Sequence, residues 1–268
     1  MTISAWLKSA ISLLSKREIP SARLDAELIL AHTLRKSRTW LHAHNDELID
    51  IRHREIADAR LDLRLDRVPI AYIIGHKEFY GRRFTVTTST LIPRPESEAI
   101  IELLGTLPLR PGMKLVDVGT GSGCLGITAK LEHPELDVAL LDIDKHALAV
   151  ASKNATQHRL AVECLKSNLL AEYPYVADVI LANLPYVDKE WNGSPELQHE
   201  PSRALYADDN GLSLIKQLID QSANKLRSGG YILLEADLRQ HHAMTYYAEQ
   251  HGLSHIETRG LIALYQSS

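Results

Sequence analysis

The chain after Pro93 alternates short apolar runs with stretches of helical periodicity, and this alternation restricts the possible folds more than any other feature of the sequence. The apolar runs with the length and composition of buried strands are Lys114–Val118, Asp137–Leu141, Val179–Ala182 and Tyr231–Glu235. Helical patterns begin near Leu125, Lys145 and Leu212. Strands and helices in alternation predict an α/β fold, in which helices wrap a mostly parallel sheet. Ligands of such sheets bind beyond the carboxyl ends of the strands.

The N-terminal part of the chain has a different pattern. Apolar residues recur at helical spacing from Ile3 to about Arg67, and Ser21 is placed to cap one of the predicted helices. The segment Glu78–Thr87 then places aromatic and β-branched residues around Gly81, which predicts a β-hairpin. We therefore expect a small all-helical domain over residues 1–70, a β-hairpin linker over 71–90 and an α/β domain over 91–268.

Composition and charge limit the classes of partner. No run reaches the roughly 18 apolar residues that a membrane span requires. Met1–Lys16 is amphipathic and unlike a signal peptide, so we expect a cytoplasmic protein with no membrane partner. The net charge of −4 argues against a protein that coats nucleic acid. Residues 1–90 carry 15 Lys and Arg against 11 Asp and Glu, which fits either a solvated helical surface or a docking surface for an acidic partner.

Metal binding is not expected from the cysteines and histidines. Cys124 and Cys164 lack the spacing of metal ligands. The paired histidines, at 42 and 44 and at 241 and 242, have no matching cluster of carboxylates or cysteines. Free thiols and scattered surface histidines account for these residues.

A glycine-rich loop follows the first predicted strand. It runs through Gly119, Thr120, Gly121, Ser122 and Gly123 before the next predicted helix begins. Closely spaced glycines let the backbone turn sharply and approach a ligand without interference from Cβ atoms, at a helix N-terminus. We expect a nucleotide-like ligand to lie across this loop.

An acidic residue ends the second predicted strand. The Asp142 carboxylate can accept hydrogen bonds from both ribose hydroxyls of an adenosine, and the neighbouring Ile143 is assigned to the same cofactor site. Asp142 could instead cap the following helix, but Asp144 is better placed for that role. The sequence therefore favours ribose binding by Asp142.

A nicotinamide cofactor has to be weighed against this adenosine ligand, because Gly121–Gly126 fits the dinucleotide fingerprint G-x-G-x-x-G. The match alone is weak, and Asp117, two residues before the first glycine, discriminates between the ligands. An acid so near the loop would repel a pyrophosphate but would not repel the amino group of a methionine. Asp117 therefore favours S-adenosylmethionine, and a nicotinamide oxidoreductase stays as an alternative.

The predicted strand Val179–Ala182 leads into Asn183-Leu184-Pro185-Tyr186, which resembles the N-P-P-Y or D-P-P-Y motif of methyltransferases that modify amide or exocyclic amine nitrogens. A planar nitrogen has a delocalised lone pair, so it attacks poorly unless acceptors hold its N–H groups. The Asn183 side-chain oxygen and the Leu184 carbonyl can accept those hydrogens, Tyr186 can stack on the planar group, and Pro185 biases Leu184 towards an extended conformation. Catalysis by these residues would rest on positioning and electrostatics, without a general base.

The whole chain resembles the release factor glutamine methyltransferase family, PrmC/HemK. The resemblance runs from Leu24 to at least Leu218, and the segments that carry it are Ser37–Leu41, Pro69–Gly75, Glu78–Gly81, Leu91–Glu98, Glu200–Leu205 and Gly211-Leu212. It implies a Rossmann-like class I methyltransferase domain with a seven-stranded, mostly parallel sheet. It also implies a small helical N-terminal domain that recognises the substrate, joined to the methyltransferase domain by the hairpin.

The resemblance also implies a reaction. A methyl group passes from S-adenosylmethionine, leaving S-adenosylhomocysteine, to the side-chain amide nitrogen (N5) of the glutamine in the Gly-Gly-Gln loop of class 1 peptide chain release factors. It places Asn168, Leu169 and Asn183 beside the cofactor, and Arg94 and Glu200 beside the acceptor. We expect the chain to act as a monomer.

Three positions depart from the family pattern. Leu184 replaces the first proline of N-P-P-Y, Asn168 stands where the family has an acid facing the adenine amino group, and Glu235-Ala236-Asp237 replaces E-H-G. Asn-Leu-Pro-Tyr is also the form found in RNA adenine-N6 dimethyltransferases. Methylation of adenine N6 or another exocyclic amine in RNA or DNA therefore stays an alternative, although the net charge of −8 over residues 91–268 opposes it. A non-catalytic binding protein is the other alternative.

Overall fold

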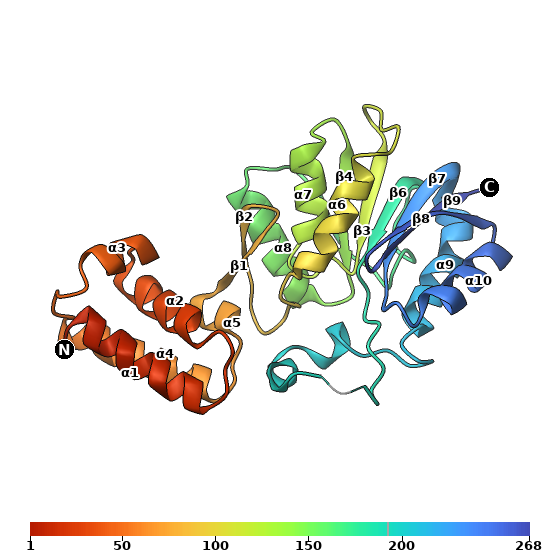
Figure 1. Cartoon of the computed structure of the whole chain (residues 1–268). Coiled ribbons are helices and arrows are strands. Elements are labelled where there is room, and N and C mark those ends of the chain that lie inside the picture. The colour runs from red at the N-terminus through yellow and green to blue at the C-terminus, as the bar shows by residue number, and fades with distance from the viewer. Residues whose placement is uncertain (192) are drawn as a thin grey trace. The chain divides into compact units, whose positions relative to one another are not determined.

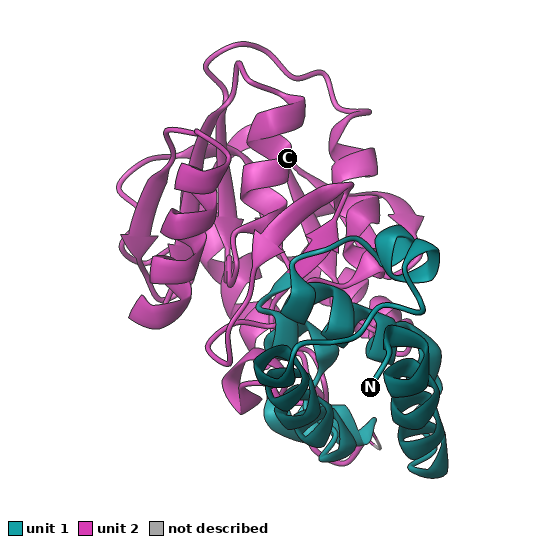
Figure 2. Ribbon diagram, turned by 90° about the vertical axis from the view of Figure 1, so that its left-hand side faces the viewer, with its two compact units in different colours: residues 1–76, 194–199 teal, residues 77–193, 200–268 magenta. Residues whose placement is uncertain are grey.

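A computed structural model describes residues 1–191 and 193–268 and shows two compact units. Unit 1 contains Met1–His76 together with the short segment Ser194–His199, and unit 2 contains Lys77–Gly193 and Glu200–Ser268. Figure 2 draws unit 1 in teal and unit 2 in magenta. The chain thus leaves unit 2 for six residues after the Asn183–Tyr186 tetrapeptide and returns to it at Glu200.

Unit 1 is built from helices, as its apolar periodicity predicts. They are α1 (Ile3–Lys16), α2 (Ala22–Leu34), α3 (Arg38–Ala43), α4 (Ile51–Leu65) and α5 (Ile70–Ile74). Their apolar faces form one core that includes Trp6, Leu14, Leu30 and Leu41. Ser21 occupies the predicted N-cap position of α2, but its side chain accepts no hydrogen bond from the backbone of that helix. Its hydroxyl donates instead to the Asp25 carboxylate at 2.7 Å.

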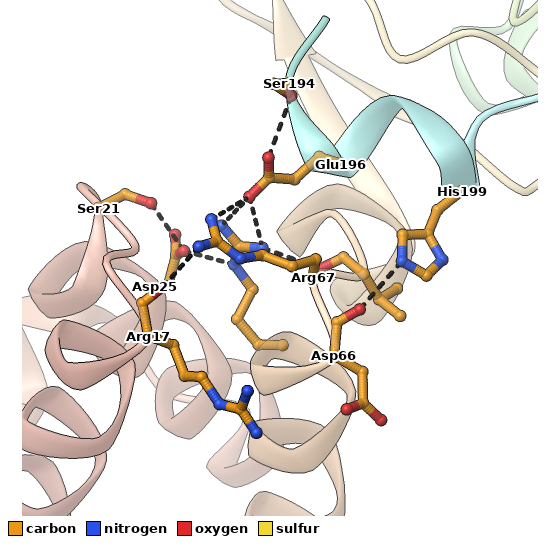
Figure 3. A network of polar contacts seen from close by, with 10 residues as sticks. Arg17, Ser21, Asp25, Asp66, Arg67, Ser194, Glu196 and His199 are labelled. Atoms are coloured by element: carbon orange, nitrogen blue, oxygen red, sulfur yellow. Dashed lines mark hydrogen bonds and ion pairs between the residues drawn. The ribbon is translucent and has the colours of Figure 1, made fainter.

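A buried ion pair lies inside unit 1. Arg64 on α4 donates through Nε to Oδ2 of Asp25 on α2 at 2.7 Å, and the two side chains are only 6% and 2% exposed. Arg64 and Arg67 also contact Glu196, at 3.2 and 3.4 Å, and this residue comes from the segment Ser194–His199. His199 of the same segment contacts the Asp66 carbonyl at 3.0 Å. Figure 3 shows how this network fixes the segment to the helices.

The predicted hairpin is present and consists of β1 (His76–Phe79) and β2 (Arg82–Thr85). Its turn consists of Tyr80 and Gly81, both with positive φ. Phe79 and Phe84 are buried in a core of unit 2, where they pack edge to face. The hairpin therefore belongs to the packing of unit 2.

Unit 2 contains a seven-stranded sheet within the described residues, with the order β5-β4-β3-β6-β7-β9-β8. The strands are β3 (Lys114–Val118), β4 (Asp137–Asp142), β5 (Glu163–Lys166), β6 (Ala177–Ala182), β7 (Leu226–Glu235), β8 (Leu253–Arg259) and β9 (Ile262–Ser267). The pairs from β5 through β7 are parallel, and β9 pairs antiparallel with both β7 and β8. From β3 the chain adds β4 and then β5 on one side of the sheet, and it then crosses back to place β6 on the other side of β3. The neighbours β3 and β6 therefore form the topological switch point of the sheet.

Helices cover both faces of this sheet (Figure 1). One core includes residues from α9 (Ser213–Lys225) and α10 (His241–Gln250) and the other residues from α6 (Glu98–Leu104), α7 (Cys124–Glu132) and α8 (Lys145–Gln157). Successive residues of β6 alternate between the cores: Ile180 belongs to the first, and Val179 and Leu181 to the second. The predicted α/β fold, with helices around a seven-stranded and mostly parallel sheet, is confirmed.

Candidate active site

A cavity of about 310 Å³ lies in unit 2 beyond the carboxyl ends of β3, β4, β5 and β6. This is within the lower range for small-molecule sites. Most of the residues predicted to bind cofactor or acceptor line it: Arg94, Gly119, Thr120, Gly121, Ser122, Asp142, Ile143, Asn168, Leu169, Asn183, Leu184 and Pro185. Parallel strands deliver all of them except Arg94 to one edge of the sheet, as the ligand rule for this architecture predicts, and Arg94 comes from the segment before η1 (Pro95–Ser97).

The glycine loop between β3 and α7 takes the shape that its composition requires. Gly119, Gly121 and Gly123 have φ values of +70°, +55° and +82°. A Cβ on Gly123 would lie 2.8 Å from Ile127 Cδ1, and one on Gly119 would lie 2.8 Å from Cδ2 of Leu184. A Cβ on Gly121 would meet only the Gly119 carbonyl, at 3.9 Å, so the loop is open there towards the cavity.

Asp117 lies beneath this loop and holds its shape. Its Oδ2 accepts hydrogen bonds from Thr120 Oγ1 at 2.6 Å and from the Gly126 amide at 2.9 Å. Its Oδ1 is buried and has no hydrogen-bond partner among the described residues. Burial raises the pKa of this carboxyl to about 6, against the opposing effect of these two hydrogen bonds. Asp117 therefore offers one spare acceptor atom.

Asp142, the last residue of β4, binds the backbone of the glycine loop that follows β3. Its Oδ2 accepts from the Gly121 amide and its Oδ1 from the Asp144 amide, both at 2.9 Å. Asp144 caps α8 by accepting from the His146 amide, so the helix-capping role falls to Asp144 as predicted. Burial raises the pKa of Asp142, and these backbone N–H groups oppose the rise. Each carboxylate oxygen keeps a further lone pair for a ligand.

The far end of the cavity contains apolar surface and one amide side chain. Ile143 is 54% exposed although it is large and apolar, and it follows Asp142 on the cavity wall. Leu169 adopts a positive φ of +54° in the turn after β5, where the Ser167 hydroxyl donates to its carbonyl at 2.7 Å. Asn168 in the same turn is exposed, so its side-chain oxygen is available as an acceptor. This end can hold a flat heterocycle with one polar edge.

The Asn183–Tyr186 loop leaves β6 directly beside the glycine loop. Asn183 donates through Nδ2 to Ser97 Oγ at 2.9 Å. Leu184 is buried with its side chain against Gly119, and Pro185 lines the cavity. The Tyr186 carbonyl accepts from Nε2 of Gln240 at 2.7 Å, which ties the loop to the start of α10. The acceptor loop and the cofactor loop are therefore packed together.

Glu235, the last residue of β7, is a site residue that was not predicted. It is buried, its Oε2 accepts from the Ser97 hydroxyl at 2.5 Å, and its Oε1 accepts from the Tyr186 hydroxyl at 3.2 Å. Burial raises the pKa of Glu235, and the pKa of the Tyr186 hydroxyl is raised as well, first by burial and then by this carboxylate.

Four predicted site residues lie outside the set of described residues that line the cavity: Asp117, Gly123, Tyr186 and Glu200. Gly123 and Tyr186 are next in the chain to the lining residues Ser122 and Pro185, and Asp117 lies beneath Thr120, from which it accepts a hydrogen bond. Glu200 accepts from Arg94 Nη2 at 2.5 Å and from the Ile92 amide at 3.1 Å, and so fixes the segment that carries Arg94. Arg203, which lines the cavity and contacts Asp144 at 3.4 Å, was not predicted.

No group of three or more His, Cys, Asp or Glu side chains in residues 1–191 and 193–268 is arranged to hold a metal ion. Over the same residues, no helix has both the length and the apolar character needed to cross a membrane. Cys124 lines the cavity, but burial raises the pKa of its thiol to about 12, so it is a poor nucleophile.

Models of protein families match two parts of the chain. Residues 5–75 match the PrmC N-terminal domain, and residues 98–200 match the methyltransferase small domain. The first match coincides with the helical part of the chain, and the second contains the glycine loop and Asn183–Tyr186.

Relatives of known name match over nearly the full length. The release factor glutamine methyltransferase of Escherichia coli K12 is 35% identical over 270 residues, covering 96% of this chain and 94% of the relative. Proteins of the same name from Salmonella typhimurium and Koribacter versatilis are 33% and 36% identical, covering 96% and 88% of this chain and 94% and 86% of the relatives.

Solved structures support the fold alone, because their sequence identities are low. A methyltransferase from Pyrococcus furiosus has a TM-score of 0.54 at 18% identity and covers 78% of this chain and 96% of its own. The hMettl16 catalytic domain, solved with an RNA hairpin, has a TM-score of 0.57 at 15% identity, with coverages of 77% and 82%.

Proposed function

Since the chain belongs to the release factor glutamine methyltransferase family, we infer that it is an enzyme that methylates the side-chain amide of a release factor glutamine, with S-adenosylmethionine as methyl donor. The observation within the structure that best supports this function is the orientation of Asn183. Its Nδ2 is engaged by Ser97, which leaves Oδ1 as the acceptor atom of a side chain that lines the cavity. A primary amide offers the N–H group that such an acceptor can hold.

The residues present fit S-adenosylmethionine. Asp117 provides a buried acceptor with no partner among the described residues, and this is the chemistry that an ammonium group needs. Asp142 can hold the ribose hydroxyls, and Ile143 and Asn168 can contact the flat face and the amino edge of the adenine. The open position at Gly121 leaves space for a ligand to cross the loop.

When bound, S-adenosylmethionine supplies an electrophilic methyl group on a sulfonium centre. The chain itself has to hold the acceptor nitrogen in line with that group. Asn183 Oδ1 and the Leu184 carbonyl accept the N–H groups of the glutamine amide and stabilise the positive charge that develops on nitrogen. Pro185 restricts Leu184 to an extended conformation, and the burial of Leu184 against Gly119 fixes that carbonyl relative to the cofactor loop.

We propose in more detail that the acceptor is N5 of the glutamine in the Gly-Gly-Gln loop of class 1 release factors. The helical residues 1–70 would recognise that protein, while the cofactor binds in unit 2. The surplus of Lys and Arg over Asp and Glu in residues 1–90 supports this division. We further propose that the enzyme acts as a monomer in the cytoplasm.

Methylation of an adenine amine in nucleic acid is the second function considered, and the relatives do not favour it. The two functions are separated by transfer of a labelled methyl group. We expect label on an intact class 1 release factor, none on its variant with Gln→Ala in the Gly-Gly-Gln loop, and none on ribosomal RNA. Label on RNA with an unlabelled factor would contradict glutamine methylation.

Asp142→Ala is expected to weaken S-adenosylmethionine binding by about 1.5–3 kcal/mol, the range for hydrogen bonds to a charged group. The reason is that the ribose hydroxyls would lose their carboxylate acceptor. Isothermal titration calorimetry measures this change, with circular dichroism as a check on folding. Asp237→Ala is the matched control, because Asp237 pairs with the exposed Arg239 and lies outside the residues that line the cavity. Equal affinities of the wild type and Asp142→Ala would remove the ribose assignment.

Cofactor affinity is expected to fall as the pH drops below about 6, by up to tenfold per pH unit. Asp117 has a pKa raised to about 6, so it is protonated below that pH and ionised above it. The cofactor ammonium group favours the ionised form, and binding at low pH therefore requires proton release. Asp117→Asn should reduce this dependence and leave the part due to Asp142, whose pKa burial also raises. Titrations at pH 5 and pH 8 test it, and a pH dependence that is the same in both proteins would exclude Asp117 as the ammonium ligand.

A further inference from the structure

Three segments that are far apart in the sequence meet behind Asn183. Ser97 ends the short helix η1 (Pro95–Ser97), Asn183 follows β6, and Glu235 ends β7. The Asn183 amide donates to Ser97 Oγ at 2.9 Å, and the Ser97 hydroxyl donates to Glu235 Oε2 at 2.5 Å. Ser97 and Glu235 are 2% and 1% exposed, so water does not compete for these contacts.

The direction of this hydrogen-bond chain follows from its buried end. Glu235 receives two hydroxyl donors, from Ser97 and from Tyr186, one on each oxygen. A serine hydroxyl has a single hydrogen, and Ser97 gives it to the carboxylate. Ser97 can then offer Asn183 only lone pairs, so the side chain must present its NH₂ group to Ser97. The Asn183 oxygen is thereby directed away from Ser97 and is the atom left for the acceptor nitrogen.

The same argument shows what would happen without the carboxylate. A neutral partner at position 235 could donate to Ser97, and Ser97 could then donate to an amide oxygen. Asn183 would rotate by half a turn about its last torsion and present NH₂ to the cavity. Two donors would then face each other, because the glutamine nitrogen of the substrate also carries hydrogens.

We propose that Ser97 and Glu235 are positioning residues, which act through Asn183 by fixing its amide with the oxygen towards the acceptor nitrogen. This rests on the proposed function, because a planar amide or amine nitrogen is the group that needs such an acceptor. The backbone of the loop is held separately: Gln240 donates to the Tyr186 carbonyl at 2.7 Å. Ser97 and Glu235 therefore set the orientation of one side chain, while Gln240 holds the loop that carries it.

The test compares Ser97→Ala, Ser97→Thr and Glu235→Gln with the wild type. We expect Ser97→Ala and Glu235→Gln to lower kcat by about 10- to 100-fold, the cost of a misaligned reacting group, with the Kd for S-adenosylmethionine unchanged within about twofold. Ser97→Thr retains the hydroxyl and should stay within about threefold of the wild-type kcat. Ser222→Ala is the control, because it removes a buried hydroxyl that donates to the Ile219 carbonyl within α9, away from the cavity.

Three results would overturn the positioning role: an unchanged kcat in folded Ser97→Ala, a loss of cofactor affinity equal to the loss of kcat, or a Ser97→Thr variant as slow as Ser97→Ala. Failure of the proposed function gives a different result, since the wild type itself would leave the release factor unmodified. The kcat ratios would then be measured on the RNA that the wild type methylates, where the same orientation of Asn183 is required and the same losses are expected.

Discussion

Asn183→Ala is expected to lower kcat for glutamine methylation by about 10²- to 10³-fold, the loss found when one group that stabilises transition-state charge is removed. The N–H of the substrate amide becomes a stronger donor when its nitrogen attacks and becomes positive, so the hydrogen bond to Asn183 Oδ1 strengthens in the transition state. Cofactor affinity should change much less. Single-turnover kinetics with an intact release factor measure the chemical step, and calorimetry measures binding.

A second amide in the same cavity provides the matched control. Asn168 lines the cavity at the end assigned to adenine and is exposed. Asn168→Ala should therefore weaken S-adenosylmethionine binding and leave the single-turnover rate at saturating cofactor near that of the wild type. Equal losses of affinity and rate in both variants would mean that Asn183 is a cofactor ligand and that its acceptor role is wrong.

Arg64→Met is expected to lower the free energy of unfolding of the helical unit by about 3–5 kcal/mol, the usual cost of leaving one member of a buried ion pair without its partner. Asp25 is 1% exposed and would lose the charged partner of its carboxylate while keeping the Ser21 hydroxyl as a donor. The substitution also removes a donor to Glu196. Urea denaturation followed by tryptophan fluorescence measures the loss, because Trp6 and Trp40 both lie in this unit.

Arg23→Met is the control for the ion pair of Arg64. Arg23 pairs with Glu27 at 3.1 Å, and its own side chain is 74% exposed although the Glu27 carboxylate is buried. Glu27 keeps Arg38 as a partner at 2.6 Å when Arg23 is removed, so we expect a cost of only about 0–1 kcal/mol. The double variant Asp25→Leu with Arg64→Met should recover most of the stability, since it removes both charges. If Arg64→Met costs no more than Arg23→Met, the pair does not stabilise the helical unit.

The sequence was most informative where local residue types determine the structure. The apolar run Lys114–Val118 became β3 without a change of boundary, and the glycines after it took the positive φ values that a close turn requires. The strand β5, Glu163–Lys166, was not predicted, because only one of its residues is even partly buried and it has no apolar run. An edge strand of this kind forms through pairing with β4, and such pairing leaves no local pattern.

The contacts that complete the site could not be predicted, because they join distant positions. Ser97 and Glu235 are separated by 138 residues, and Arg64 and Glu196 by 132. Nothing in the type or spacing of one residue in either pair points to the other. In the sequence, Glu235 is marked only by the change from E-H-G to Glu235-Ala236-Asp237. Its contacts with Ser97 and Tyr186 form only when β7 lies beside β6.

Glutamine methylation is tested most directly by mass spectrometry of an intact class 1 release factor that has been incubated with the wild-type chain and S-adenosylmethionine. We expect one added methyl group, located by fragmentation on the side-chain amide of the glutamine in the Gly-Gly-Gln loop, and a much smaller yield with Asn183→Ala. An unmodified glutamine, in a reaction mixture where the same chain methylates adenine in added RNA, would contradict this function.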